Sequence, residues 1–441
     1  MTGGDLHAAI LDRTARVAVV GLGYVGLPLA CAFAERGFHV LGIDIDRTKI
    51  DHLRQGTSYI RAVPSEVVRR LATAGTFAVD DGFDRLVDQD IVVICVPTPL
   101  TPQRSPDLHH VTATCEAIGQ RLRPGQMVVL ESTTYPGTTR DVVTPILERS
   151  GLEAHRDFLV AYAPEREDPG NPRYGAGNTP RVVGADDPRS LRCAAALYEA
   201  LCGAVHPVSS AAVAEATKLT ENIFRSVNIA LVNELKIILS GMDIDIWEVI
   251  GAAGTKPFGF MPFHPGPGSG GHCIPIDPSY FSWKARAHGH RARLVDLAGE
   301  INRAMPIHVV DVLVRGLGRI LGKPIGAARI LLVGLAYKKN TDDTRESPAV
   351  ELMARLEALG ATVEYFDPLV PCIPCNGAHP SLAGRSSVPW APETFGRFDA
   401  ALIATDHDGV DHATLPDRVP LVVDTRNAVP ARRAGGTVLR A

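Results

Sequence analysis

The sequence predicts an α/β protein in which two domains with parallel sheets are joined by a long central helix and a helical bridge. Three observations predict this class. An apolar run at residues 16–21 is followed by a Gly-rich turn, an Ala-rich helical stretch and a second apolar run that ends at Asp44. A similar alternation restarts near Arg329. Between them, residues 211–241 carry one uninterrupted helical pattern.

Chain length gives a matching division. The chain has 441 residues, which corresponds to about three domains at roughly 150 residues each. We therefore expect an N-terminal α/β domain over 1–205, a central helical domain over 206–305 and a second α/β domain over 306–441.

Composition excludes several classes of partner. The chain has 45 Lys and Arg against 49 Asp and Glu, a net charge of −4, which argues against nucleic acid and against a polybasic membrane surface. It still allows a local group of Lys and Arg around one small anion. There is no apolar run long enough for a membrane helix and no signal-peptide pattern at the N-terminus. Eight scattered cysteines are typical of reduced thiols, so we expect a cytoplasmic protein.

The first 205 residues read as alternating strands and helices. A strand at 16–21, a helix at 27–36 that Gly37 ends and a strand at 40–44 form one βαβ unit. Further strands are expected at 91–96, 127–131, 158–161 and 181–183.

The turn of that βαβ unit carries a dinucleotide fingerprint. Gly21 permits a tight turn, Gly23 lets the backbone approach a pyrophosphate, and Gly26 allows close packing of helix on strand. Asp44 can accept hydrogen bonds from both ribose hydroxyls and would repel a 2′-phosphate, which favours NAD over NADP. Arg47 nearby slightly weakens that preference. The alternative is a Gly-rich turn that serves packing only.

The central helical pattern has two stripes. One is apolar and contains Leu219, Ile223, Val227, Ala230, Leu231, Leu235 and Ile238. The other is polar and contains Glu215, Lys218, Asn222 and Arg225, roughly opposite. The polar stripe is either a solvated face or a functional one. In the second case a partly buried lysine could stabilise an oxyanion, or act as a base if its pKa is lowered. A second helix is expected near Ile246, and another near 291–305.

A loop between those helices contains the segment Gly270-Gly-His-Cys-Ile-Pro-Ile-Asp277. Two glycines before Cys273 would let a substrate approach the backbone closely, and Asp277 lies four residues on. Cys273 is either a reactive thiol, whose thiolate would be the attacking species, or a small core residue.

The C-terminal part repeats the strand and helix pattern. Strands are expected at 330–334, 362–367, 400–405 and 421–424, with a helix at 347–359. Its first turn reads Gly334-Leu-Ala-Tyr-Lys-Lys339 in place of the glycine-rich fingerprint.

Taken together, these motifs resemble the nucleotide-sugar 6-dehydrogenase family, the UDP-glucose, UDP-GlcNAc and UDP-ManNAc dehydrogenases. The resemblance covers nearly the whole chain. It rests on Gly21–Gly26, Cys95–Pro99, Glu131–Gly137, Pro164-Glu-Arg166, Lys218–Asn222, Gly270–Cys273 and Lys338–Pro348. It implies two Rossmann-like domains, NAD as cofactor, and four-electron oxidation of the sugar C6 hydroxymethyl group to a carboxylate.

The resemblance also implies catalytic roles. Cys273 would attack the C6 aldehyde to give a thiohemiacetal and then a thioester. Lys218 would stabilise the oxyanion, with Asn222 as its hydrogen-bonding partner. Asp277 and Thr133 would position the water that acts as base, and Glu165 would assist thioester hydrolysis.

Binding residues follow from the same resemblance. NAD would contact Gly21, Gly23, Tyr24, Val25, Gly26, Asp44, Thr98, Thr133 and Arg345. The nucleotide sugar would contact Glu165, Arg166, Glu167, Lys218, Asn222, Arg225, His264, Gly270, Lys338, Lys339 and Arg426. Lys338 would meet the diphosphate. The family commonly forms dimers through the central helices, so we expect a homodimer or a larger homo-oligomer.

Substrate choice remains open at this point. The run Arg166-Glu-Asp-Pro-Gly-Asn171, the Pro-Phe-Gly-Phe-Met-Pro run at 257–262 and the Ile-Pro-Ile-Asp after Cys273 are similar to the UDP-N-acetylglucosamine 6-dehydrogenase branch. The alternatives are UDP-ManNAc, UDP-glucose or an unusual sugar. Other classes also remain: a nucleotide-sugar-binding protein without chemistry, and a two-electron dehydrogenase.

One further signal is a CxxC pair, Cys372 and Cys375, with His379 four residues on. A structural zinc site needs four ligands, and there is no second CxxC pair, although His407 and His412 could contribute. We therefore expect no metal and a surface loop; a redox pair is the other alternative.

Overall fold

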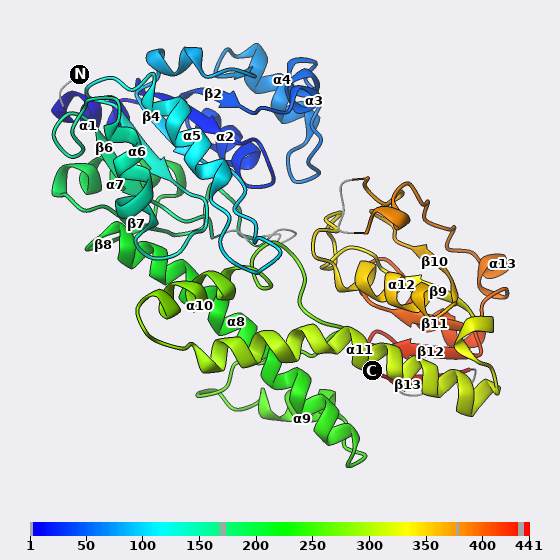
Figure 1. The fold of residues 1–441 in the computed structure, drawn as a ribbon. Coiled ribbons are helices and arrows are strands. Elements are labelled where there is room, and N and C mark those ends of the chain that lie inside the picture. The colour runs from blue at the N-terminus through cyan, green and yellow to red at the C-terminus, as the bar shows by residue number, and fades with distance from the viewer. Residues whose placement is uncertain (1–2, 167, 169–172, 376–378, 431–435) are drawn as a thin grey trace. The chain divides into compact units, whose positions relative to one another are not determined.

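The computed structural model describes residues 3–166, 168, 173–375, 379–430 and 436–441, and it has the expected α/β architecture (Figure 1). The chain divides into two compact units. Unit 1 consists of residues 1–221 and 279–290, and unit 2 of residues 222–278 and 291–441. The expected division into three domains stays a prediction.

Unit 1 is built on an eight-stranded sheet with the order β3-β2-β1-β4-β5-β6-β7-β8. Neighbouring strands are parallel, except that β6 and β7 pair antiparallel, so the expected parallel sheet is confirmed apart from that one pairing. The strands are β1 (Arg16–Val20), β2 (His39–Ile43), β3 (Phe77–Asp80), β4 (Ile91–Ile94), β5 (Met127–Leu130), β6 (Leu159–Tyr162), β7 (Arg181–Gly184) and β8 (Val205–Val208).

Helices cover both faces of this sheet. They are α1 (Gly3–Leu11), α2 (Gly26–Glu35), α3 (Arg47–Arg54), α4 (Ser65–Thr73), α5 (His109–Gly119), α6 (Thr144–Glu148) and α7 (Pro188–Cys202), with short turns η1 (Asp84–Asp88) and η2 (Thr139–Val143). Val17 and Val19 face a core shared with α1, α2 and α7. Ala18 and Val20 face a core shared with α5, η2 and α6. This alternation buries both faces of β1, as expected for a central parallel strand.

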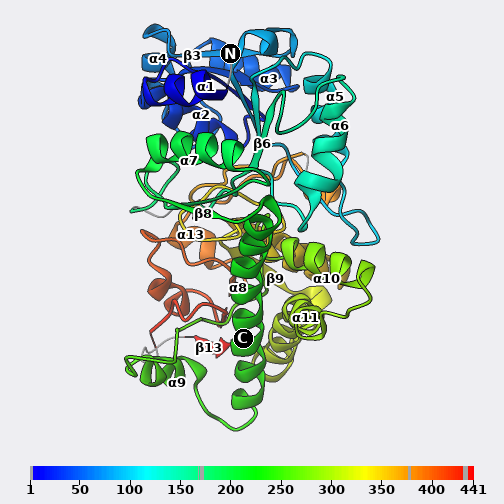
Figure 2. The same cartoon turned by 90° about the vertical axis from the view of Figure 1, so that its left-hand side faces the viewer.

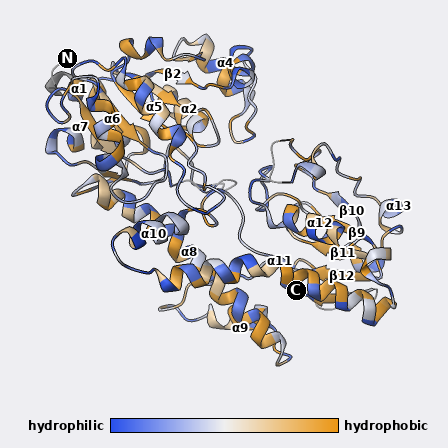
Figure 3. Ribbon diagram, in the orientation of Figure 1, coloured by the Kyte–Doolittle hydropathy of each residue, from blue (hydrophilic) through white to orange (hydrophobic). Residues whose placement is uncertain are grey.

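Unit 2 is built on a fully parallel five-stranded sheet with the order β10-β9-β11-β12-β13. Its strands are β9 (Arg329–Val333), β10 (Thr362–Phe366), β11 (Ala400–Ile403), β12 (Leu421–Asp424) and β13 (Thr437–Arg440). Its helices are α9 (Ile246–Ala253), α11 (Arg293–Leu321), α12 (Pro348–Ala358) and α13 (Pro392–Phe395), with η3 (Ile325–Ala327), η4 (Pro380–Leu382) and η5 (His412–Asp417). Strands at the centre of both sheets are largely hydrophobic (Figure 3).

Two helices belong to both units. α8 (Ala211–Ser240) is one unbroken helix that begins in unit 1 and ends in unit 2 (Figures 1 and 2). α10 (Asp277–Ala287) begins at the end of a unit 2 segment and lies mostly in unit 1. Among the described residues, no helix combines the length and the apolar character that a bilayer-spanning segment needs.

The expected strands and the helices α2, α8, α9 and α12 are confirmed within a few residues. The helix expected near 291–305 instead extends to Leu321 and contains Pro306. β3, β8 and β13 were not predicted, because four-residue strands carry little periodicity. The helices α1, α3, α4, α5, α6, α7, α10 and α13 were not predicted either.

The two stripes of α8 behave differently from a solvated helix. Glu215, Lys218 and Asn222 of the polar stripe are buried, whereas Arg225 is exposed. Several apolar side chains on the unit 2 part of the helix are exposed: Phe224, Leu231, Leu235, Ile237 and Ile238. The polar stripe is therefore not a solvated face, and its buried members need partners.

Candidate functional site

The turn after β1 has the geometry that a dinucleotide pyrophosphate needs. Gly21 has φ +92°, and a Cβ there would lie 2.6 Å from the Cys95 carbonyl oxygen. A Cβ on Gly26 would lie 1.8 Å from the Gly21 oxygen, whereas a Cβ on Gly23 would meet nothing within 4 Å. Gly21 and Gly26 are thus required by packing, and Gly23 leaves the backbone open to a ligand. Tyr24 and Val25 lie on the same turn, immediately before α2.

Asp44 follows β2 and faces this turn. Its carboxylate accepts a hydrogen bond from the Leu22 backbone nitrogen at 2.8 Å and from the Asp46 nitrogen at 2.9 Å. The Lys49 ammonium lies 3.0 Å from Oδ2, a partner that the sequence did not indicate. Arg47 instead pairs with Asp81 at 3.1 Å. Asp44 is therefore fixed toward the Gly-rich turn, as ribose recognition requires.

Other unit 1 loops are held by buried side chains. The Tyr280 hydroxyl donates to the Thr98 carbonyl oxygen at 2.8 Å. Thr133 is half-buried and lies just after β5. The segment beyond it is fixed by Glu215 of α8, which accepts from the Gly137 nitrogen at 2.5 Å and the Thr139 nitrogen at 2.8 Å. Burial raises the pKa of Glu215 to about 7 despite these hydrogen bonds.

Lys218 and Glu165 are brought together in unit 1. The Lys218 ammonium donates to the Glu165 backbone oxygen and lies 3.6 Å from its Oε2. The Lys218 side chain is buried and that of Glu165 is largely buried, with exposed fractions of 6% and 12%. Within the part of the chain that the structure describes, Glu165 Oε1 is buried and has no hydrogen-bond donor. A buried carboxylate oxygen without a donor is suited to accept a proton from water.

Arg166 is engaged by a partner that the sequence did not indicate. Its guanidinium meets Glu221 of α8 at 2.6 Å and donates to the Pro180 oxygen at 2.9 Å. Glu167, expected beside it, lies outside the described residues.

In unit 2, Cys273 lies one turn before α10. Its carbonyl oxygen accepts from the Ile276 nitrogen at 3.2 Å and from the Asp277 nitrogen at 2.8 Å. The Asp277 side chain in turn accepts from the Asn222 amide at 2.6 Å, and both side chains are buried. The pairing of Asn222 with Lys218 that the resemblance implies stays a prediction. Cys273 itself is partly exposed, whereas Cys31, Cys115 and Cys193 are buried.

His272, next to Cys273, is held neutral. Burial, followed by the charge of Arg345, lowers its pKa to about 4. At neutral pH it therefore supplies no imidazolium charge to the neighbouring thiol.

The glycine pair before Cys273 has a packing role that the sequence did not indicate. A Cβ on Gly270 would lie 2.7 Å from Pro348 Cδ, and one on Gly271 would lie 2.7 Å from the Tyr337 ring. Gly271 also donates to the Arg345 oxygen at 3.2 Å and has φ +82°. Gly270 and Gly271 are therefore needed for packing against Pro348 and Tyr337, and the expectation that they let a substrate approach the backbone stays a prediction.

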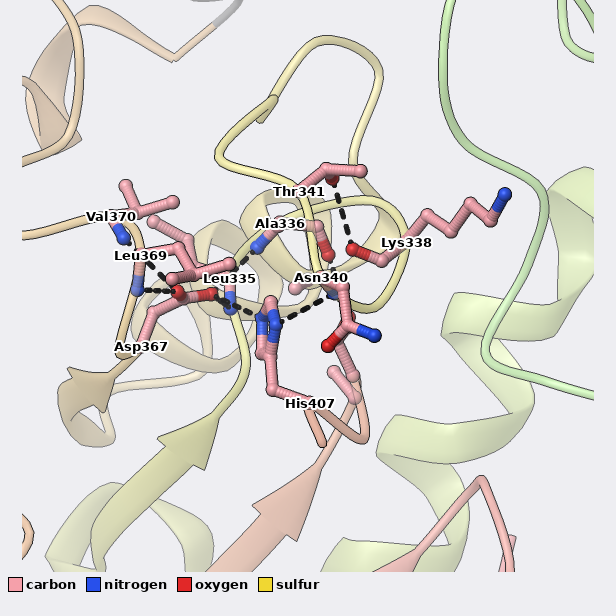
Figure 4. Close-up of polar contacts among 12 residues, drawn as sticks. Leu335, Ala336, Lys338, Asn340, Thr341, Asp367, Leu369, Val370 and His407 are labelled. Carbon is pink, nitrogen blue, oxygen red and sulfur yellow. Dashed lines mark hydrogen bonds and ion pairs between the residues drawn. The ribbon is translucent and has the colours of Figure 1, made fainter. Parts of the chain in front are cut away.

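Lys338 and Lys339 lie on the turn after β9. The Thr341 hydroxyl donates to the Lys338 oxygen at 3.0 Å, and the Lys339 ammonium meets Asp408 at 3.1 Å. The turn rests on a buried pair, Asp367 and His407, that the sequence did not single out as a pair (Figure 4).

The remaining expected binding residues are spread through unit 2. Arg345 binds both oxygens of Asp343. Arg426 donates to the Ala404 oxygen at 2.9 Å, and a Cβ on Gly266 would lie 2.6 Å from its guanidinium. The exposed His264 stacks on Trp247 at a centroid distance of 5.3 Å. Burial lowers the pKa of Arg426, since it disfavours the charged form.

The expected site residues thus form two sets, each described within its own unit. Unit 1 joins the Gly-rich turn to Asp44 and Lys218 to Glu165. Unit 2 joins Asn222 to Asp277 and the glycine pair to the Lys338 turn. Glu215, Lys49 and His407 were missed as partners. Glu215 carried a signal, since an acidic residue one turn before Lys218 on the same helical face was visible.

The CxxC pair shows no metal geometry in the described chain. Cys372 and Cys375 are exposed, and His379 is bonded to Glu351 at 3.0 Å. Within residues 3–166, 168, 173–375, 379–430 and 436–441, no three His, Cys, Asp or Glu side chains are grouped to hold a metal ion.

Comparisons with known proteins cover almost the whole chain. Models of the UDP-glucose/GDP-mannose dehydrogenase family match in three parts: the NAD binding domain at residues 15–202, the central domain at 212–304 and the UDP binding domain at 331–431. A UDP-N-acetyl-D-glucosamine 6-dehydrogenase from Pseudomonas aeruginosa is 37% identical over 89% of this chain and 90% of its own. An NDP-N-acetyl-D-galactosaminuronic acid dehydrogenase from Ralstonia solanacearum is 34% identical over 95% and 97%.

A solved structure agrees with these matches. The UDP-D-ManNAc dehydrogenase from Pyrococcus horikoshii superposes with a TM-score of 0.87 at 31% identity, covering 96% of this chain and 98% of that one.

Proposed function

This chain belongs to the UDP-glucose/GDP-mannose dehydrogenase family, and from that premise we propose that it oxidises C6 of UDP-N-acetylglucosamine to a carboxylate. It is an NAD-dependent UDP-sugar 6-dehydrogenase. The choice of sugar is supported by the P. aeruginosa relative and by the residues after Glu165 and Cys273. Relatives named for N-acetylmannosamine and N-acetylgalactosaminuronic acid make those sugars the alternatives, with glucose behind them.

The observation that carries the proposed chemistry is the setting of Cys273. It is a partly exposed thiol on a Gly-hinged turn at the start of α10, with the anchored carboxylate of Asp277 one turn away. A structural cysteine would be expected in a core, as Cys31 and Cys115 are.

The residues around the β1 turn fit NAD. The open position at Gly23, the free N-terminus of α2 and the fixed Asp44 would hold the pyrophosphate and the adenine-side ribose. Thr98 and Thr133 lie on the loops after β4 and β5, at the same carboxyl edge of the sheet. When bound, the oxidised nicotinamide accepts a hydride from the sugar carbon in each of two oxidations.

The first oxidation requires removal of the C6 hydroxyl proton. Asp277 and Thr133 would position the water that takes this proton, and Lys218 would stabilise the resulting alkoxide. The buried ammonium of Lys218 is suited to this because a charge in a dry site acts strongly on a developing oxyanion.

The second oxidation uses the thiol. The Cys273 thiolate attacks the C6 aldehyde and forms a C–S bond, which gives a thiohemiacetal, and loss of a hydride from C6 leaves a thioester. Water then attacks the thioester carbonyl, Glu165 takes the proton of that water through its free Oε1, and the C–S bond breaks to release carboxylate and thiolate.

The test measures stoichiometry and product together. The purified protein with UDP-N-acetylglucosamine and NAD⁺ should form two NADH per sugar and a product with the mass of the uronate. The Cys273→Ser variant should form no acid while it still binds NAD⁺, and Cys202→Ser, a partly exposed cysteine at the end of α7, should behave as wild type.

Each alternative has its own outcome in the same experiment. One NADH per sugar would indicate a two-electron dehydrogenase, and binding without NADH would indicate a non-catalytic protein. Normal uronate formation by Cys273→Ser would contradict the covalent mechanism. Turnover of another sugar from a panel, without turnover of UDP-N-acetylglucosamine, would overturn the substrate assignment.

The proposal includes a homodimer. The exposed side chains of Phe224, Leu231, Leu235 and Ile238 form an apolar strip on the unit 2 part of α8, and such a strip is suited to a twofold interface. Light scattering should give twice the chain mass of 47.1 kDa, and Leu231→Asp should shift it toward the monomer. The cytoplasmic location remains a prediction.

A further inference from the structure

We propose that His407 is a positioning residue that fixes the Lys338 turn for binding of the nucleotide diphosphate, by accepting a hydrogen bond from the Asn340 backbone. The inference rests on the proposed function, in which Lys338 meets that diphosphate.

His407 lies between a carboxylate and a backbone N–H (Figure 4). Its Nε2 is 3.0 Å from Asp367 Oδ2, and its Nδ1 is 3.1 Å from the Asn340 nitrogen. A backbone N–H can only donate, so Nδ1 must accept and the proton of the neutral ring must be on Nε2, from which it is donated to Asp367. The two contacts therefore select one tautomer and one ring orientation.

Asp367 has no freedom to change this arrangement. Its Oδ2 also accepts from the Leu335 and Ala336 nitrogens at 2.7 and 3.0 Å. Its Oδ1 accepts from the Leu369 and Val370 nitrogens at 2.8 and 3.0 Å. Burial alone would raise its pKa, but the hydrogen bonds from His407 and from the backbone hold the pKa below its ordinary value. Asp367 is thus a fixed anchor for the imidazole.

At its Nδ1 atom, the imidazole accepts a hydrogen bond from Asn340, a residue in a strained turn. Asn340 has φ +63°, a left-handed conformation that costs free energy for a residue with a side chain. Its side chain is held by Asp408, to which Nδ2 donates at 2.7 Å. Since Lys338 lies two residues before Asn340, the bond to His407 sets the direction in which the turn presents Lys338. Figure 4 shows the Lys338 side chain pointing away from His407.

A turn that is fixed through its backbone presents Lys338 from a defined position, and this suits the binding of a diphosphate. A lysine ammonium is a flexible point charge with three donors. It binds an anion tightly only where its stem starts from a defined position, because otherwise binding must order the turn as well.

The experiment uses two amide replacements of His407 in the full-length protein, each of which can imitate one of the two ring nitrogens. In His407→Asn, the side-chain oxygen can occupy the Nδ1 position and still accept from Asn340. In His407→Gln, the longer amide can still donate to Asp367 but leaves the Asn340 N–H without its acceptor. UDP alone is titrated by calorimetry, and KM for the nucleotide sugar and for NAD⁺ is measured separately.

We expect His407→Gln to weaken UDP binding by roughly fivefold to tenfold, since one partly buried hydrogen bond from the backbone is lost. His407→Asn should bind UDP within about twofold of wild type. Both variants should keep the wild-type KM for NAD⁺, and the rise for His407→Gln should be in KM for the sugar rather than in kcat. Equal UDP affinity in both variants, whether at the wild-type value or equally reduced, would overturn the inference, because a merely structural role predicts no split.

A second variant separates this result from the proposed function. Lys338→Ala should abolish measurable UDP binding. If wild type binds UDP and Lys338→Ala binds it equally well, the proposed diphosphate site is wrong irrespective of His407. If wild type itself does not bind UDP, the proposed function fails and the inference with it.

Discussion

The two units contain the same strand, turn, strand and acid, but the acid accepts more hydrogen bonds in unit 2 than in unit 1. Gly21-Leu-Gly-Tyr24 follows β1, and Gly334-Leu-Ala-Tyr337 follows β9. Gly21 donates to the Ile43 oxygen at 2.8 Å, and Gly334 donates to the Phe366 oxygen at the same distance. Asp44 and Asp367 are the residues directly after β2 and β10, and each accepts from the residue after the first glycine.

The difference lies in how many donors each acid has. Asp44 accepts from Leu22, Asp46 and Lys49, and the Lys49 side chain is one-third exposed. Asp367 accepts from four backbone nitrogens and from His407, whose side chain is 2% exposed. A carboxylate offers about four lone-pair sites, so Asp367 is saturated whereas Asp44 can still receive a hydroxyl.

The turns of the two units also differ in how soon the next helix begins. In unit 1, α2 begins at Gly26, directly after the turn. In unit 2, α12 begins only at Pro348, and residues 338–347 form an added loop that carries Lys338 and Arg345. One framework thus provides two settings for a nucleotide: an open turn beside a partly unsatisfied acid in unit 1 and, under the proposed function, cationic side chains on a fixed loop in unit 2.

The largest expected effect is a loss of stability on replacing the glycine that begins the turn in each unit. Gly21→Ala and Gly334→Ala should each destabilise the fold by about 2–5 kcal/mol, because a Cβ would lie 2.6 Å or 2.2 Å from a backbone oxygen at positive φ. Denaturant unfolding measures this. Gly151→Ala and Gly384→Ala are matched controls with positive φ and no atom within 4 Å, and they should cost only about 1 kcal/mol.

The two acids, Asp44 and Asp367, should respond differently to the same replacement, because they differ in how many hydrogen bonds they accept. Asp44→Asn should weaken NAD⁺ binding by roughly 10–100-fold, up to about 3 kcal/mol, because charge-assisted hydrogen bonds to ribose are lost. Asp367→Asn should leave NAD⁺ affinity unchanged and should lower thermal stability instead, since an amide cannot satisfy five donors. Titration with NAD⁺ and thermal unfolding of both variants distinguish the two roles. A large loss of NAD⁺ affinity in Asp367→Asn would show that the second acid is also a cofactor site.

Contacts between residues close in the sequence were predictable, whereas contacts between distant residues were not. Gly21, Gly26 and Asp44 are adjacent elements of one βαβ unit, so their spacing alone predicted the NAD turn. His407 is 40 residues from Asp367 and 67 from Asn340, and only the strand order β10-β9-β11 brings the three loops together. The polar stripe of α8 was visible, but its burial was not, because helical periodicity does not tell which stripe a neighbouring loop covers.

A change in pH should alter the stability of the two units in opposite directions. The pKa of Glu215 is raised from 4.5 to about 7, so between these values the folded chain holds a proton that the unfolded chain has lost, and stability falls as pH rises. The pKa of His272 is lowered from 6.5 to about 4, so the unfolded chain holds the extra proton and stability falls as pH falls. From pH 5 to 6.5 each group should contribute about 2 kcal/mol, with opposite signs.

Two variants isolate these slopes. Glu215→Gln should remove the loss of stability on raising the pH, and His272→Gln should remove the loss on lowering it. Hydrogen exchange corrected for its intrinsic pH dependence assigns each change to unit 1 or unit 2. Parallel slopes for the two variants would contradict the assignment of the buried carboxyl and the buried imidazole to opposite effects.

The smallest expected effect is that of removing Lys49. It tests whether Asp44 depends on Lys49 for its position as closely as Asp367 depends on His407. Lys49 is a partly exposed ion-pair partner, and such pairs contribute about 0–1 kcal/mol. It also covers Oδ2, an oxygen that a ribose hydroxyl could use. Lys49→Gln should therefore change NAD⁺ affinity by less than about threefold, and NADP⁺ affinity should fall further because a cation near the 2′ position is removed. A tenfold loss for NAD⁺ would mean that Asp44 depends on its side-chain donor as closely as Asp367 does, and the distinction between an open acid and a saturated one would no longer hold.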